Sequence, residues 1–178
     1  MIVLGFILNG KSFKHYPEIF KESGTAITDF VEIMGIGNTL TNMGIVGLIG
    51  MLYIELVGGH YNGATLGGIL TMVGFAAFGK QPKNIYPVML GVYFGTVFSV
   101  SNANDPGPLL AALFVTTIAP LAGRYGPFIG ILAGFVHLSA VSFTGVLHGG
   151  LNLYNNGFTA GLVATVFIGV IKGYTERD

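Results

Sequence analysis

One polar motif, N-G-x-T-x-G, occurs twice in the sequence, and its side chains suit hydrogen bonding inside an apolar protein. Its asparagine, threonine and glycine positions are Asn62, Gly63, Thr65 and Gly67 in the first copy and Asn156, Gly157, Thr159 and Gly161 in the second. Both copies stand where a polar loop gives way to an apolar run, which predicts a helix start with the asparagine as N-cap. Helix starts carry unpaired N–H groups and the positive end of the helix dipole. Paired helix starts build polar sites in many transporters.

These residues fit two interpretations. In the first, the asparagine amides and threonine hydroxyls line a solute path, and the glycines let a solute or another backbone approach closely. In the second, Asn-Gly is a common turn, Thr65 and Thr159 bond carbonyls of the preceding turn, and the glycines serve helix packing. A single copy favours the second interpretation, while the double occurrence of the motif leaves both open.

Two ionisable residues within the apolar runs are further candidates, because a charge at membrane depth is costly and is usually functional. Glu55 lies near the end of an apolar run, where it can reach water and serve a solute site or a proton relay. His137 lies midway through a later run. It is predicted to be neutral there, either on the solute path or in an interhelical hydrogen bond.

The sequence gives little support for catalysis or for a cofactor. Cysteine is absent, and no G-x-S-x-G, H-E-x-x-H, P-loop or dinucleotide-binding motif occurs. His60 and His148 are expected in loops on the same side, where Glu55 and Asp105 could approach them, but these residues form no dense ligand motif, so no metal is predicted. The formal net charge of +0 gives no reason to expect a nucleic-acid partner. We therefore expect a protein that is not an enzyme.

The elements that carry these residues are predicted to be membrane helices. Charged residues make up 9% of the chain, against about 25% in soluble domains, and the mean hydropathy is +0.71. Long runs without charge, such as those from Glu32 to Glu55 and from Arg124 to Lys172, suit helical spans of about 20 residues. We expect an all-α integral membrane bundle of about six short transmembrane or re-entrant helices, at 43–57, 63–79, 84–100, 108–123, 125–147 and 157–172.

We expect one membrane domain over 1–178, divided into an entry segment (1–38), a first repeat unit (39–123) and a second repeat unit (124–178). Segment 25–34 is too short to cross a bilayer and carries Asp29 and Glu32 on one face, so it is predicted to be an interfacial or re-entrant helix. The first nine residues are typical of the tail of a helix. This indicates that a longer chain precedes them or that a partner completes the segment.

The basic residues predict an orientation. If every span crosses, all 8 Lys and Arg residues fall on the same side, which the positive-inside rule makes cytoplasmic. The expected location is the inner membrane of a bacterial cell. On the opposite side, Asp105 is expected to cap the fourth span.

The stretch from His148 to Leu162, together with His60-Tyr-Asn-Gly-Ala-Thr-Leu-Gly-Gly, resembles a bacterial membrane family known only as domain of unknown function 1576. The resemblance covers most of the chain, as the C-terminal part of longer members. More distantly, Gly59-His-Tyr-Asn-Gly-Ala-Thr-Leu-Gly-Gly is similar to the G-x-x-Y/F-N-x-x-L-x-G motif of urea transporters, which are channel-like and trimeric. The L-P-x-x-T-x-P-F motif of the urea filter is absent, so this resemblance implies a transport class but not urea.

Two functional hypotheses follow. The first is a transporter or channel-like domain for a small, neutral polar solute, with its path near the two helix starts. The second is a non-transporting membrane subunit whose glycine-rich faces pack against another copy or against an N-terminal half of the same protein. In either case the lipid bilayer is the main environment, and a homo-oligomer is expected.

Overall fold

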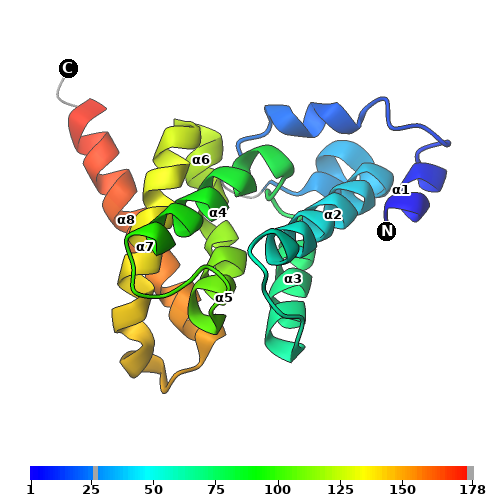
Figure 1. Ribbon diagram of the computed structural model, residues 1–178. Coiled ribbons are helices and arrows are strands. Elements are labelled where there is room, and N and C mark those ends of the chain that lie inside the picture. The colour runs from blue at the N-terminus through cyan, green and yellow to red at the C-terminus, as the bar shows by residue number, and fades with distance from the viewer. Residues whose placement is uncertain (26–27, 176–178) are drawn as a thin grey trace.

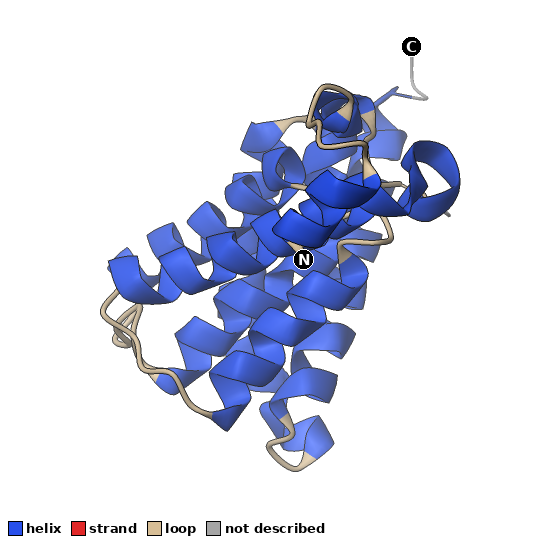
Figure 2. Cartoon of the chain, turned by 90° about the vertical axis from the view of Figure 1, so that its right-hand side faces the viewer, coloured by secondary structure: helices blue, strands red, loops and turns tan. Residues whose placement is uncertain are grey.

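The computed structural model describes residues 1–25 and 28–175, and within them the chain is all-helical, as the sequence predicts. In chain order the helices are α1 (Ile2–Leu8), η1 (Tyr16–Lys21), α2 (Phe30–Leu56), α3 (Gly63–Phe75), α4 (Pro82–Val97), α5 (Pro106–Phe114), η2 (Val115–Ile118), α6 (Ala119–Tyr125), α7 (Pro127–Thr144), η3 (Gly145–His148) and α8 (Asn152–Thr175). Figure 1 shows η1 above α2, and α4 to α8 gathered on the other side of the molecule, and in Figure 2 the loops lie at the helix ends.

A helix occupies each of the six apolar runs, but the elements differ in length. Among the described residues, 4 stretches are long and apolar enough to cross a bilayer: Phe30–Leu56, Pro106–Tyr125, Pro127–His148 and Asn152–Thr175. The helices α3 and α4 are shorter, with 13 and 16 residues. The chain is therefore compatible with a membrane protein, while a bundle of six crossing helices stays a prediction.

Over the part that the structure describes, the helix predicted at 25–34 is present as a short helical segment that starts after Asp29 and is set off from the rest of α2 by a kink at Gly35. Asp29 is the N-cap of α2 and accepts hydrogen bonds from the backbone N–H groups of Val31 and Glu32. The following residues form a short helical segment that ends where Gly35 adopts a non-helical backbone conformation with a φ of 76°. Glycine tolerates this conformation without a Cβ clash, and the long part of α2 continues beyond it. Residues 26 and 27 lie outside the described part.

Close approach of α4 and α7 forms the centre of the bundle. Gly91 on α4 and Gly134 on α7 face each other, and a Cβ on either one would collide with a backbone carbonyl of the opposite helix. Around this contact, Val88, Val92 and Leu113 are fully buried in one large apolar core. Small residues that let helix backbones approach closely are typical of membrane helix pairs.

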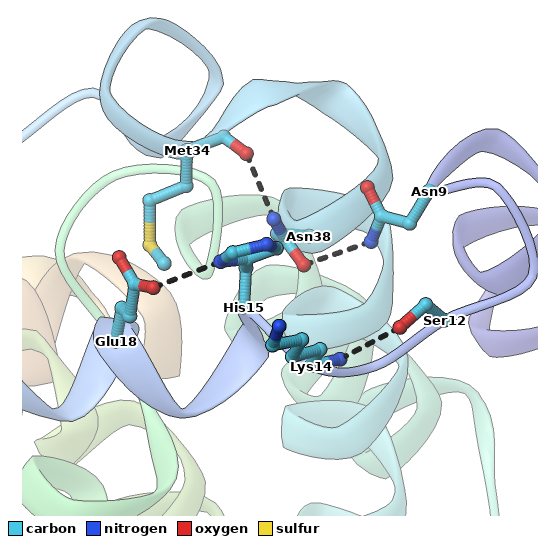
Figure 3. Close-up of polar contacts among 7 residues, drawn as sticks. All are labelled: Asn9, Ser12, Lys14, His15, Glu18, Met34 and Asn38. Atoms are coloured by element: carbon cyan, nitrogen blue, oxygen red, sulfur yellow. Dashed lines mark hydrogen bonds and ion pairs between the residues drawn. The ribbon is translucent and has the colours of Figure 1, made fainter.

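The N-terminal segment is tied to α2 by polar side chains. Asn9 donates to Asn38 Oδ1 at 2.8 Å, and the Asn38 amide donates to the Met34 carbonyl at 2.9 Å (Figure 3). Deeper in the protein, Asn42 donates to the carbonyls of Ala76 and Lys80 at 2.7 and 2.8 Å. The segment α1, which the sequence predicts to be helical, thus lies against α2 as part of the fold.

Candidate functional site

The first copy of the motif is a capping box at the start of α3. The Asn62 side chain accepts from the N–H groups of Ala64 and Thr65 at 2.9 and 3.1 Å. The Thr65 hydroxyl in turn accepts from the Asn62 N–H at 2.8 Å and bonds the His60 carbonyl at 3.1 Å. The N-cap prediction for Asn62 is confirmed. These polar groups satisfy one another locally, while Gly63 and Gly67 face outward.

The second copy does not begin a helix, so the N-cap prediction for Asn156 is wrong. Gly149 and Gly150 both have positive φ and end the α7 to η3 stretch. The chain therefore turns before the motif, and α8 begins at Asn152. One turn later, Asn156 and Thr159 lie inside α8 and are 1% and 0% exposed. The same sequence motif thus forms a helix cap in the first copy and a buried polar helix face in the second.

Asn156 pairs with His137 across the interface of α7 and α8. His137 Nε2 lies 3.0 Å from Asn156 Oδ1, and Asn156 Nδ2 donates to the Asn152 carbonyl at 2.9 Å. Because the Asn156 amide donates to its own helix, its oxygen accepts from His137, so the imidazole carries its proton on Nε2. His137 Nδ1 is then a buried acceptor, with no hydrogen-bond partner among the described residues. The interhelical hydrogen bond expected for His137 is present.

A second group of polar side chains, Thr144, Asn155 and Thr159, lies on the same interface between α7 and α8. The Thr144 hydroxyl donates to Asn155 Oδ1 and lies 2.6 Å from the Thr159 hydroxyl. Asn155 Nδ2 donates to the Val141 carbonyl at 3.0 Å, and Thr159 bonds the Asn155 carbonyl at 2.8 Å. Sequence reasoning missed Asn155 and Thr144. Their signal is spacing: Asn155 and Thr159 stand at i and i+4, which places both on one helix face.

A cavity of about 260 Å³ borders this polar interface at the end of the bundle that holds the turn from α7 to α8. Its lining residues are uncharged and mostly small or polar: Ser99, Ser101, Gly107, Pro108, Leu138, Val141, Ser142, Gly145, Gly150, Asn152, Asn155 and Asn156. A water molecule occupies about 30 Å³ in the liquid, so the space suits a molecule of several heavy atoms. We call this space the amide cavity.

The family model for proteins of unknown function DUF1576 matches residues 8–173. The chain belongs to the DUF1576 family. No curated protein and no solved structure matches it. The matched range of this DUF1576 chain contains both motif copies and every residue that lines the amide cavity.

The structure does not bring all the predicted site residues of this DUF1576 protein together. Of the motif residues, only Asn156 lines the amide cavity, while Thr159 lies behind it in contact with Thr144. Gly157 and Gly161 are exposed on another face of α8. Glu55 is exposed at the end of α2. The pKa of Tyr61 is raised by desolvation and, secondarily, by the Glu55 carboxylate. Asp105 is the N-cap residue of α5, and its side chain accepts from the Asn102 N–H at 2.7 Å.

Lys80, which sequence reasoning did not single out, is the other buried ionisable group of note. It lies in the connection between α3 and α4, is 5% exposed, and its ammonium group donates to the Thr116 hydroxyl at 3.0 Å. The same group lies 4.9 Å from the centre of the Phe75 ring. Burial lowers the pKa of Lys80 to about 7, because desolvation disfavours the charged form. In the sequence this lysine looks like an ordinary loop residue.

Proposed function

We propose that this protein is a membrane transporter or channel-like domain for a small, neutral polar solute, and that the amide cavity is its solute site. The observation that carries the proposal is the cavity itself, which joins an uncharged, polar lining to the hydrogen-bonded interface of α7 and α8. Ligand sites commonly combine a concave, partly apolar wall with a few fixed polar groups. Here the fixed groups are amides and hydroxyls, which bind donors and acceptors alike.

The absence of charged side chains from the described lining supports a neutral solute. An ion entering this space would lose hydration without meeting an opposite charge, which costs several kcal/mol or more. A neutral molecule with hydroxyl or amide groups would exchange its water bonds for those of Asn155, Asn156 and Ser142. His137 Nδ1, one layer deeper, is an acceptor available to a donor that reaches it.

The proposed setting is the inner membrane of a bacterial cell, with the basic end of the bundle in the cytoplasm. Lys21, Lys83 and Arg124 line one cavity, and Arg124 and Lys172 line another at the same end. In Figure 1 the end of α8 lies at the top, opposite the turn from α7 to α8 at the bottom. By the positive-inside rule, the amide cavity then opens on the far side of the membrane.

Solute flux into liposomes tests the proposal. Gly145 lines the amide cavity with a helical φ of −57°, and a Cβ there would make only an ordinary contact of 3.6 Å with Asn155 Nδ2. Gly145→Leu is therefore expected to fill the cavity and abolish uptake, while Gly145→Ala keeps most of it. Gly173→Leu is the control, because that glycine is open and lies near the other end of α8. Equal flux in all three variants would refute the site, and no flux of any small neutral solute through the wild type would refute the function.

One observation favours the second candidate, a non-transporting subunit. Both motif copies continue into an outward face with glycines four residues apart: Gly63 and Gly67 on α3, and Gly157 and Gly161 on α8. An added Cβ would meet nothing within 4 Å at any of these positions. Such faces suit packing against another copy or a further membrane segment. If Gly67→Leu and Gly161→Leu change the particle mass in detergent, and wild-type liposomes pass no solute, this candidate replaces the first.

A further inference from the structure

A groove of about 380 Å³ runs between α6 and α8 and shares no lining residue with the amide cavity. Its walls are apolar, with Ile118 and Leu121 on the side of η2 and α6 and Ala164 and Ile168 on the side of α8. Only 17% of the hydrophobic window of α8 is buried inside the protein. In a bilayer this groove therefore faces lipid tails.

Two cations stand at the mouth of the same groove. Arg124 lies in the last turn of α6 and Lys172 in the last turn of α8, and both line the space. No acidic side chain belongs to its described lining. The ion pair found in the described part of the chain joins His15 and Glu18 at the start of η1, so neither Arg124 nor Lys172 is paired with a carboxylate among the described residues.

The position of these cations matches the depth of a phospholipid phosphate. Each one ends a helix long and apolar enough to cross the bilayer, Pro106–Tyr125 for Arg124 and Asn152–Thr175 for Lys172. The ends of such spans lie at the level of the headgroups. Tyr125, whose ring lies 5.5 Å from the Arg124 guanidinium, also lines the groove, and tyrosine is enriched at this interface.

Positive charge continues beyond the groove. Arg124 also lines a neighbouring cavity of about 350 Å³, where Lys21 and Lys83 join it together with one acidic residue, Glu22. An anion held between Arg124 and Lys172 therefore lies next to a region with an excess of basic groups. A zwitterionic headgroup would bring its own cation into that region, which is unfavourable.

We propose that the groove between α6 and α8 binds an anionic phospholipid, with an acyl chain against Ile118, Leu121, Ala164 and Ile168 and the phosphate between Arg124 and Lys172. Basic pockets between membrane helices favour such headgroups. The apolar walls select a lipid over a soluble phosphate, because burial of the chain contributes about 0.8 kcal/mol per CH₂ group. This site is independent of the proposed transport function.

Native mass spectrometry of the intact protein in neutral detergent tests this site. The protein is offered equal amounts of phosphatidylglycerol and phosphatidylcholine with identical acyl chains. Each basic group near the headgroups raises the affinity for an anionic lipid by about fivefold, so we expect the wild type to prefer phosphatidylglycerol by about 25-fold. The double variant Arg124→Gln and Lys172→Gln should lose this preference and keep the weak binding of phosphatidylcholine.

The matched control replaces two basic residues of the N-terminal segment, Lys11→Gln and Lys14→Gln, which line neither cavity. It should retain the wild-type preference, and helical circular dichroism spectra should agree among all three proteins. A preference that survives in the double variant, or falls equally in the control, overturns the site. Displacement of the lipid by millimolar inorganic phosphate would also overturn it, because the ligand would then be a soluble anion.

Discussion

Replacement of His137 by leucine tests the most deeply buried polar contact of the candidate site. The imidazole is 0% exposed, and its Nε2 lies 3.0 Å from Asn156 Oδ1 in a hydrogen bond. His137→Leu leaves that oxygen without its partner, a change that costs about 1–3 kcal/mol in soluble proteins. The substitution also removes the unpaired Nδ1 acceptor, which lessens the loss. In addition, polar contacts between membrane helices contribute about 0.6 kcal/mol on average, with a maximum near 1.7. We therefore expect the free energy of unfolding to fall by about 1 kcal/mol.

A double-mutant cycle isolates this contact. His137→Leu, Asn156→Leu and the double variant are unfolded reversibly by sodium dodecyl sulfate in lipid–detergent micelles. The two single losses should exceed the loss in the double variant by about 0.6–1.7 kcal/mol, because the double variant leaves neither partner unsatisfied. Ser139→Ala, an exposed hydroxyl on the same helix that bonds its own turn, should change stability by less than about 0.5 kcal/mol. Additive single losses would refute the interhelical hydrogen bond.

Three further outcomes are expected. Gly134→Ala should destabilise the protein by at least about 1–3 kcal/mol, since its methyl group meets the Val88 carbonyl across the interface of α4 and α7; Gly161→Ala, which meets nothing, is the control in the same unfolding assay. Asn42→Ala should cost about 2–3 kcal/mol by the same measurement, because it strips two buried carbonyls of their donor. For Lys80, whose pKa falls to about 7 in the folded protein from 10.5, the unfolded state binds more protons between those values. Wild-type stability should therefore rise with pH across that window by at most about 1.4 kcal/mol per pH unit, and Lys80→Met should remove the slope.

Much of the fold follows from the pattern of charge and apolarity alone. A bilayer tolerates few charges and requires satisfied backbone groups, so charge-free runs translate directly into helices. The lengths of the helices were predicted less well than their positions. The sequence predicts a short helix at 25–34 and a span from residue 43, but it does not show that helix fills the residues between them, as it does in α2 after the kink at Gly35. A glycine with positive φ is indistinguishable in sequence from one that serves packing.

The candidate site was only partly predictable. His137 was predicted as a polar residue within an apolar run, where a polar side chain must find a partner. Asn156 and Thr159 were instead predicted at a helix start, and the structure places them inside α8, where both are buried. Thr144 and Asn155, which bond each other, lie on either side of the turn from α7 to α8. They meet only because of the way α8 packs against α7, which the sequence does not show. The groove of Arg124 and Lys172 likewise depends on packing, because the two residues end helices that are not consecutive in the chain.

The two copies of N-G-x-T-x-G show how context decides what one motif does. In the first copy the preceding loop is extended, with Asn62 at φ −151°, and the asparagine turns its oxygen back onto the free N–H groups of α3. In the second, the glycine pair before the motif turns the chain earlier, and α8 has completed a turn when Asn156 is reached. Its backbone N–H is then paired, so the side chain is free to bond His137 on the neighbouring helix. A helix start five residues earlier relative to the motif thus converts a local cap into an interhelical contact.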